Sequence, residues 1–569
     1  MRCERRYTHR TAQLTVLFVH RLDLLAARKK LLTQCRLACV AVIIVILLAP
    51  SVIWVLCDHS VWPWDEAGYG YWTLLTWQAK YSGPLGWLSA WLHVSLRPPL
   101  IVWIGQFFVP FRHLTGGFES SMLLSNLAVA AGTLVLIYTM AQEYSATRLE
   151  TVVALIACGG STYFVGLTHL YLTELLQCFT TASVMSVAWR AERRPLIRTV
   201  LLMLIAVSLS FAAKASSAPF VLPFLAYTTL VVIATRGCAR PPVAKSDALL
   251  FIAAAAIAAA IVAWYVINWE DAVAHFIEAT IGKAALYYGS PVVLPTKLRY
   301  WISVLSAALS PITVLSAAVC IAIVLGIVVA VVRLWKVPVH DLINVAIENG
   351  TLFALVIAAT ILLTLLTFSL QINEDGRFVL PLIPMIAILL SWSLSVLRQK
   401  ILTALFVCAL ATSTVFVNSS TFGMDILNLT KIPEYWQAQF DRNDASVLTT
   451  AVRTTCPPEN ANRTNLFLVD YIRLNLNSAN FYSEKDSYTT GYRCNYWHIG
   501  YAETDVQRAL DRLNAVAPPY VITVAPEKQP LPDFLNICTK DMTLIIASDS
   551  HYSLTTKPGD YLQIYRKVR

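Results

Sequence analysis

Six charged residues lie in the loops between the long apolar runs of this chain or at the ends of these runs, and their types suit the transfer of a group from a phosphate to a hydroxyl. A carboxylate can accept the proton of an attacking hydroxyl. Arg and Lys can neutralise the negative charge of a departing phosphate. The carboxylates are Asp65, Glu66 and Glu174, and the cations are Arg97, Lys214 and Arg377.

Each of these residues also has a plain structural explanation. Asp65 and Glu66 could cap a short helix, because Asp is favoured at helix N-termini. Glu174 could be an acid of a first helical turn, where the helix dipole favours negative charge. The cations could extend to the membrane interface or pair with a nearby acid. A functional site is favoured because all six fall on one predicted face of a membrane.

Further candidates for the wall or lid of a pocket lie on the same predicted face. A Gly-Ser-Pro turn follows Tyr287 and Tyr288. This segment could order over a substrate, as lids do, or could form another interfacial anchor. A lone His is a weak metal signal, so we assign no metal ligand and no certain cofactor, and a divalent cation between the acids stays open. The candidates are Tyr69, His169, His275, Tyr287 and Tyr288.

Composition places these residues in a membrane protein. Of the 569 residues, 57% are hydrophobic and 14% are charged, whereas a soluble domain is about 25% charged. This excludes a soluble enzyme, a disordered scaffold and a fibrous repeat. The net charge of +10 lies in predicted cytosolic loops and is not concentrated in one domain, so no nucleic-acid partner is expected.

Eleven apolar runs are long enough to cross a bilayer of about 30 Å, which predicts an all-α polytopic transmembrane fold over residues 37–418. Basic residues near helix ends stay in the cytosol, and the Arg-rich arm at 1–36 is expected there. With this orientation, 21 Lys and Arg residues are cytosolic and 8 lie in outer segments before residue 419. The runs are 37–57, 118–140, 149–168, 172–190, 197–213, 217–235, 247–268, 302–332, 346–370, 379–397 and 401–418.

Two outer loops are long enough to hold structure of their own. The first, 58–117, contains seven Trp, which is typical of helices that lie in the membrane interface. Its run at 98–114 is interpreted as interfacial, because a crossing there would turn the Arg-rich connection at 189–198 outward. The second loop, 269–300, is expected over the mouth of the pocket.

Residues 419–569 read as an extracytoplasmic soluble domain, since eleven crossings place them outside the cytosol. Cys456, Cys494 and Cys538 lie in this domain, and one disulfide can form among them, but the sequence does not choose the pair. A bacterial inner membrane is favoured, or the endoplasmic reticulum membrane in a eukaryotic host. The tail is a small α/β domain by its pattern, with strand-like runs at 466–469, 520–524, 544–547 and 561–565 and a helical pattern at 504–516.

Five short motifs, in order, resemble those of the GT-C integral-membrane glycosyltransferases, particularly the protein O-mannosyltransferase and lipid A aminoarabinose transferase branch. Trp64-Asp65-Glu66-Ala67-Gly68-Tyr69 resembles the "DEARY"-type motif of the first loop. Arg97-Pro98-Pro99 resembles "(K/H)PP", and Thr173-Glu174 resembles the acid of "(T)DxPLL". The last two are Lys214 in Ala213-Lys214-Ala215, similar to "LTKGP", and Arg377-Phe378-Val379-Leu380-Pro381, similar to "RYLLP".

The resemblance covers roughly residues 37–400 and implies a GT-C fold. It also implies transfer of a sugar from a polyprenyl-phosphate donor to an acceptor hydroxyl of a lipid, protein or envelope glycan, on the periplasmic or luminal face and with inversion. By the match, Asp65 is the general base with Glu66 and Glu174 as acidic neighbours. Arg97, Lys214 and Arg377 hold the lipid phosphate. The chain departs from the motifs in three places, with Arg97 for Lys or His, Glu174 for Asp, and Gly68 for Arg.

Two other functions compete with the enzyme. A transporter or lipid-linked-sugar flippase would suit many helices and an intramembrane Lys, but its charges would sit near mid-bilayer between repeated halves, and no duplication is visible. A purely structural membrane protein leaves the outer-face acids and cations without a reason. Nucleotide-driven chemistry is disfavoured, since neither a Walker-type loop nor a dinucleotide fingerprint occurs.

Overall fold

The structure of the chain is a computed structural model. It forms two compact units, Met1–Pro50 and Ser51–Arg569, and the packing described below is that of the second. The predicted basic arm at 1–36 lies outside the described residues. These are residues 38–568 except 95–96, 145–146, 236–245, 425–435, 439–442, 472, 501–502, 526–533 and 557–560.

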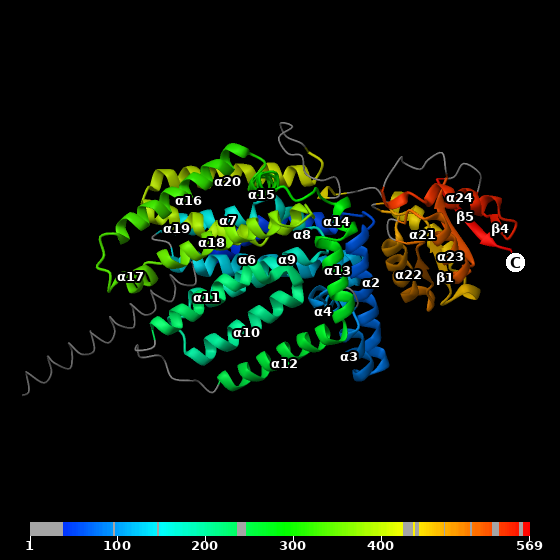
Figure 1. Ribbon diagram of the computed structural model, residues 1–569, viewed down its shortest axis with the longest axis horizontal. Helices are drawn as coiled ribbons and strands as arrows, with labels where there is room; N and C mark the ends of the chain where they lie inside the picture. The colour runs from blue at the N-terminus through cyan, green and yellow to red at the C-terminus, as the bar shows by residue number, and fades with distance from the viewer. Residues whose placement is uncertain are drawn as a thin grey trace, which may run out of the picture. The chain divides into compact units, whose positions relative to one another are not determined.

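The fold is mostly helical and polytopic, as the sequence predicts (Figure 1). Nine helices of the described residues are long and apolar enough to cross a membrane, or ten if the bent pair α7 and α8 counts as one span. Helices occupy all eleven predicted runs, because α9 occupies the run that these candidate spans leave over. Their bounds are Ala38–Cys57, α6 Phe118–Tyr144, α7 Arg148–Gly159, α8 Thr162–Thr168, α9 Thr173–Trp189, α10 Leu196–Ala213, α11 Ala218–Ala234, α12 Ser246–Ile267, α16 Thr313–Leu334, α18 Thr351–Ser369, α19 Leu382–Leu397 and α20 Lys400–Thr421.

Three predicted runs are not single helices, and one of them is the run at 149–168, which the bent pair α7 and α8 forms. The run at 302–332 is divided between α15 (Leu294–Leu309) and α16, because Pro311 cannot donate a helical hydrogen bond and holds Ser310 extended, with φ −158° and ψ 143°. The run at 346–370 is divided between α17 (Leu342–Glu348) and α18 at Gly350, whose φ of +73° favours glycine. Each of the last two breaks shifts the membrane-crossing part of the run toward the C-terminus.

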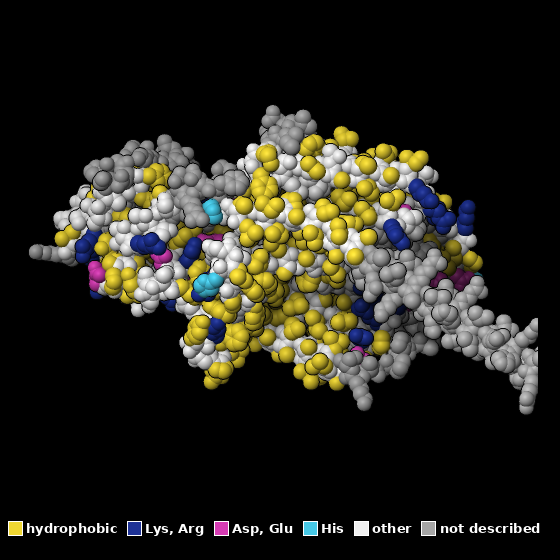
Figure 2. Space-filling model, turned by 180° about the vertical axis from the view of Figure 1, so that it is seen from behind, with side chains coloured by type: hydrophobic (Ala, Val, Ile, Leu, Met, Phe, Trp, Pro, Cys, Tyr) yellow, Lys and Arg dark blue, Asp and Glu magenta, His cyan; other side chains and the backbone are white. Residues whose placement is uncertain are grey.

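The centre of the helical bundle is α19, and its outer surface is apolar. Of the candidate spans, the one containing α19 is the most buried, and it packs against α6, α7, α16 and α18. Large apolar side chains are exposed on α12, α16 and α20. Hydrophobic side chains cover much of the face in Figure 2, with Lys and Arg gathered toward its margins. Such a surface suits lipid as its solvent.

The first long loop folds into short helices. The longest is α2 (Trp64–Ala79), which is followed by η1 (Lys80–Ser82) and α3 (Pro84–Leu92). The interfacial run contains α4 (Leu100–Gly105), η2 (Val109–Phe111) and α5 (Arg112–Thr115), all far shorter than a bilayer-spanning helix. The second long loop contains α13 (Trp269–Thr280) and α14 (Lys283–Tyr287).

The C-terminal part contains a five-stranded mixed sheet, which confirms the predicted small α/β fold. The strand order is β2-β1-β3-β5-β4; β1 runs parallel to β2 and β3, and β5 runs antiparallel to β3 and β4. The strands are β1 Thr464–Phe467, β2 Asn495–Trp497, β3 Tyr520–Val524, β4 Tyr552–Leu554 and β5 Leu562–Lys567. The helices are α21 Asn443–Thr455, α22 Leu476–Thr490, α23 Val506–Val516 and α24 Thr539–Ser548.

The strand predicted at 544–547 is wrong, since these residues belong to α24. Met542 and Ile546 are fully buried at a spacing of four residues and join the core under the sheet, which is a helical and not an alternating pattern. The other three predicted strands and the helix α23 are present within one or two residues of their expected bounds. The short apolar run alone did not distinguish helix from strand.

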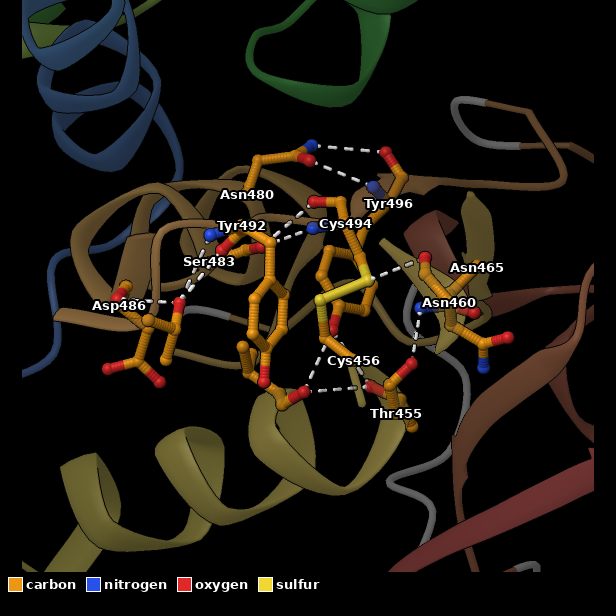
Figure 3. The surroundings of a disulfide bond; sticks show 12 residues. Thr455, Cys456, Asn460, Asn465, Asn480, Ser483, Asp486, Tyr492, Cys494 and Tyr496 are labelled. Atoms are coloured by element: carbon orange, nitrogen blue, oxygen red, sulfur yellow. Dashed lines mark hydrogen bonds between the residues drawn. A yellow bond between two sulfur atoms is a disulfide. The ribbon is translucent and has the colours of Figure 1, made fainter. Parts of the chain in front are cut away.

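A disulfide joins Cys456 and Cys494 (Figure 3), which decides the pairing that the sequence left open, and Cys538 is buried as a free thiol. The backbone of Cys494 exchanges two hydrogen bonds with the hydroxyl of Ser483, at 2.8 and 3.0 Å. The disulfide therefore connects the end of α21 to the segment between α22 and β2.

The helix α22 packs against α2. The Ser478 hydroxyl donates to the carbonyl of Trp62 at 2.7 Å, and Trp64 donates through Nε1 to Asp470 at 2.6 Å. The rings of Trp62 and Phe481 stack with 5.2 Å between their centroids. These contacts hold the sheet-bearing part of the chain against the first turns of α2.

Candidate active site

The acids of α2 do not cap it. Pro63 occupies the N-cap position, and no side chain there accepts a capping hydrogen bond. Asp65 and Glu66 lie in the first turn, where the helix dipole favours negative charge, but both carboxylates contact other parts of the chain. The N-cap explanation is therefore wrong for these residues.

Asp65 lies between two arginines that come from distant segments. Its Oδ1 is 2.7 Å from Nη1 of Arg97, which precedes α4, and its Oδ2 is 3.8 Å from Nη2 of Arg377. Burial alone would raise the pKa of Asp65, but the positive charges of Arg97 and Arg377 outweigh it and lower this pKa to about 2. The Asp65 carboxylate is thus ionised and held by cations at neutral pH.

Glu66 has the opposite environment, although it is the next residue. Its side chain is buried, and its Oε1 accepts the backbone N–H of Tyr171 at 2.5 Å. Burial raises the pKa of Glu66 to about 8, because the N–H of Tyr171 and the charge of Arg377 compensate only partly. At neutral pH Glu66 is therefore largely protonated.

Tyr171 fixes the connection between α8 and α9. Its hydroxyl donates to the carbonyl of Ile101 at 2.9 Å and lies 3.0 Å from the hydroxyl of Thr73, while its ring stacks on Trp62. A Cβ at Gly105 would overlap this hydroxyl. The packing around Tyr171 thus joins α2, α4 and the start of α9.

The third acid is paired with the third cation. Glu174 lies in the first turn of α9, and Lys214 follows α10. The distance between Glu174 Oε1 and Lys214 Nζ is 2.7 Å. Lys214 Nζ also lies 4.0 Å from the centroid of the Phe378 ring, a cation–π geometry. Glu174 is buried, so this ion pair is held in a site with little water.

Arg377 connects the two ion pairs. It belongs to η4 (Gly376–Val379), pairs with Asp375, and receives electrostatic stabilisation from both Asp65 and Glu174. Although burial opposes ionisation of Asp375, Arg377 and Lys214 lower its pKa. The six predicted charged residues therefore form one cluster.

Two of the predicted pocket residues join this cluster. Tyr69 is one turn beyond Asp65, and its ring centroid is 5.6 Å from the guanidinium carbon of Arg97. His275, on α13, is close enough to interact electrostatically with Arg97 and Asp65. Burial and the charge of Arg97 lower the pKa of His275 to about 4 despite Asp65, so the imidazole is neutral at pH 7.

The other three are placed differently. His169 stacks on Trp54, with 4.4 Å between ring centroids, and its Nε2 is 3.0 Å from the hydroxyl of Ser51. Tyr287 and Tyr288 end α14 and are partly exposed. The carbonyl of Tyr288 accepts the N–H of Glu374 at 3.1 Å, which links this segment to the residues that precede Arg377.

The structure adds residues that the sequence did not single out. Asp375 competes with Asp65 for Arg377, and Tyr171 orients Glu66. Lys297, on α15, is fully buried beside Glu374. The acids were visible in the run before Arg377, but nothing in the sequence pointed to Tyr171. Within the described ranges, no three His, Cys, Asp or Glu side chains come together as metal ligands would.

Similarity to known proteins was found in structure and not in sequence. No protein-family model and no curated protein matches the chain. The structure of ArnT from Cupriavidus metallidurans bound to undecaprenyl phosphate is similar with a TM-score of 0.57 at 12% identity, over 93% of this chain and 98% of that chain. Its apo state gives 0.52 at 11% identity, with the same coverage.

A third similar structure is the archaeal oligosaccharyltransferase AglB from Archaeoglobus fulgidus, in complex with an inhibitory peptide and a dolichol-phosphate. Its TM-score is 0.49 at 12% identity, over 92% of this chain and 74% of that chain. ArnT is covered along nearly its whole length by this chain. The chain therefore has the fold of the GT-C integral-membrane glycosyltransferases.

Proposed function

We propose that this chain is a membrane glycosyltransferase that moves a sugar from a polyprenyl-phosphate donor to the hydroxyl of a lipid, protein or glycan acceptor. The observation that carries the proposal is the position of Asp65 between Arg97 and Arg377. A carboxylate next to cations in a partly buried site provides what a hydroxyl nucleophile and a phosphate leaving group require. The similar ArnT structure contains undecaprenyl phosphate, which supports a lipid-phosphate donor here.

The reaction is a single displacement with inversion. The acceptor oxygen attacks the anomeric carbon, its proton passes to Asp65, and the bond between that carbon and the phosphate oxygen breaks. The electron pair leaves with the lipid phosphate, whose charge Arg97, Arg377 and Lys214 neutralise. Since the donor is already activated, no nucleotide is needed.

Donor binding prepares the base. In the cluster, Asp65 has a low pKa because Arg97 and Arg377 hold it ionised. A phosphate that binds these arginines neutralises part of their positive charge. The pKa of Asp65 therefore rises, and the carboxylate becomes a better proton acceptor. Arg377 is the more distant partner of Asp65, at 3.8 Å, so a phosphate would draw it away from Asp65 first.

The acids around Asp65 have different roles. Glu66 is protonated at neutral pH, so it adds no second negative charge near the donor phosphate. It also orients the turn at Tyr171. Glu174 holds Lys214 in place for the phosphate. Tyr69, beside Arg97, and His275, neutral on α13, line the pocket. Tyr287 and Tyr288 belong to a segment that covers its mouth.

Several features support an extracytoplasmic location for the site and the sheet-bearing domain. The disulfide between Cys456 and Cys494 is of a kind that persists in oxidising compartments. The sheet-bearing part contacts the same turns of α2 that carry Asp65. We propose a bacterial inner membrane, or the endoplasmic reticulum membrane in a eukaryotic host, with residues 1–36 in the cytosol.

The test is mass spectrometry of envelope lipids, glycans and glycoproteins from cells that express the wild type, no protein, or Asp65→Asn. Loss of one sugar from one acceptor in both mutants is expected. Asp511→Asn, the same change on an exposed turn of α23, is the matched control and should keep the product. Normal product in Asp65→Asn cells would remove Asp65 as the base. A lipid-linked precursor trapped on the cytosolic side of deletion cells, with all products intact, would favour a flippase.

A further inference from the structure

Lys297 is a lysine without access to solvent. It lies in the first turn of α15, and its side chain is 0% exposed. A lysine is almost never fully buried unless an acid or several acceptors compensate for the lost water. Lys297 is therefore held by specific partners, and these partners indicate its role.

The partners all belong to the segment that leads to Arg377. Lys297 Nζ donates to the carbonyl of Ile372 at 2.5 Å and lies 3.1 Å from Oε1 of Glu374. The same Glu374 oxygen accepts the hydroxyl of Ser290 at 2.8 Å, and the hydroxyl of Tyr300 donates to the Glu374 carbonyl. The ammonium group thus fixes both the backbone and the side chain of this segment.

A short chain of hydrogen bonds continues from there to the candidate site. Asn373 forms a bridge with Gly289, and its Oδ1 accepts the N–H of Asp375 at 2.9 Å. The Oδ1 of Asp375 accepts the N–H of Arg377 at 3.1 Å, and the same carboxylate pairs with the guanidinium. Each step is local, so displacement of Glu374 would reorient Arg377.

We propose that Lys297 is a positioning residue for the transfer reaction: it holds the turn at 372–377 so that Arg377 faces both Asp65 and the phosphate of the donor. This inference rests on the proposed function. Lys297 does not touch the donor itself, because its side chain is inaccessible. It acts through Arg377, whose distance of 3.8 Å from Asp65 depends on the geometry of the turn.

The reason to keep a lysine at this position is geometric. A buried ion pair is not an efficient source of stability, since an apolar side chain of similar volume often serves as well. A charged group that bonds to a backbone carbonyl and to a carboxylate instead fixes one conformation of the turn. Misplacement of a catalytic group by about 1 Å can cost about 100-fold in rate, so this order has a functional consequence.

The test compares Lys297→Met, Lys297→Arg and Arg377→Ala in the full-length protein. Undecaprenyl phosphate binding and steady-state transfer are measured for each variant, with Lys336→Met, at an exposed position after α16, as the matched control. We expect Lys297→Met to weaken binding and raise the donor KM by about tenfold, an effect of the size of one lost charge-assisted contact, while Lys297→Arg restores most of both. The double variant Lys297→Met/Arg377→Ala should be no weaker than Arg377→Ala alone, because coupled residues are not additive.

Two results would overturn the inference. One is a Lys297→Met protein with lower thermal stability but unchanged donor affinity and KM; the other is a double variant whose losses simply add. If Lys297→Met does not fold, Glu374→Gln, which removes the charge partner and keeps the shape, gives the same comparison. Failure of the proposed function is distinguishable, because then the wild type itself neither binds the lipid phosphate nor transfers a sugar.

Discussion

Asp65 and Arg97 form the shortest ion pair that Asp65 makes, with 2.7 Å between Oδ1 and Nη1. Asp65 therefore competes with the donor phosphate for Arg97, because we assign the same guanidinium to the phosphate. The carboxylate that serves as base therefore also tunes donor affinity.

Asp65→Asn is expected to bind undecaprenyl phosphate about fivefold more tightly than the wild type while it loses transfer. The physical reason is that removal of a partly exposed ion pair, worth about 1 kcal/mol, leaves Arg97 and Arg377 available to the phosphate. Equilibrium binding in detergent measures the affinity. Weaker binding by Asp65→Asn would show that the carboxylate does not compete with the phosphate.

Glu66 should make the protein less stable at alkaline pH. The pKa of Glu66 in the folded protein is about 8 and its ordinary value is 4.5, so the folded state retains a proton that the unfolded state has released. Its contribution to stability is full below about pH 4.5 and is lost as the pH rises to about 8. The charged groups that act on Glu66 are Asp58, Asp65 and Arg377.

Glu66→Gln tests this contribution, because the amide oxygen can still accept the N–H of Tyr171. Thermal unfolding at pH 6 and pH 9 should show a decrease for the wild type and a smaller decrease for Glu66→Gln. Equal decreases for the two proteins would place the titrating group elsewhere.

Lys214→Met should destabilise the protein by about 3–5 kcal/mol, the usual cost of leaving one charge of a buried pair without its partner. Glu174 would then be buried without its ion-pair partner. The double variant Lys214→Met/Glu174→Gln should recover most of the stability but not the donor affinity. Chemical denaturation and binding of undecaprenyl phosphate separate the two effects, and recovery of both would remove Lys214 from the phosphate site.

Gly105→Ala should displace Tyr171 and with it the partner of Glu66. The added methyl group would overlap the Tyr171 hydroxyl, and such overpacking costs about 1–3 kcal/mol. Gly117→Ala is the matched control, because its new Cβ would meet only an ordinary contact, 3.4 Å from an oxygen of Glu119. A lowered melting temperature for the first variant alone is expected, and equal values would indicate that Tyr171 can move freely.

Replacement of both Cys456 and Cys494 by Ser should lower the stability of the sheet-bearing domain. The bond closes a loop with a sequence separation of 38 residues, for which the loop-entropy model gives about 4 kcal/mol. Limited proteolysis of the variant should cut first between α21 and β2. Cys538→Ser, at the buried free thiol, is the control and should leave this pattern unchanged.

Much of the architecture is determined by the sequence itself. Long apolar runs specify membrane helices because a helix satisfies its backbone hydrogen bonds within the segment, as the bilayer requires. Charges in the first outer loop and at the ends of the runs marked five segments of the site. The errors came where the local signal was ambiguous: Pro311 divided one run, and α24 has an apolar stretch too short to distinguish helix from strand.

Tertiary structure alone decided which charge meets which. Asp65 meets Arg377 across more than three hundred residues. The neighbours Asp65 and Glu66 have pKa values of about 2 and about 8, because one faces arginines and the other is buried, with a backbone N–H that offsets the burial only partly. Lys297 has a partner only because α15 packs beside the turn before Arg377. Hydropathy and charge are local properties of a chain, whereas burial and ion pairing depend on elements that only folding brings together.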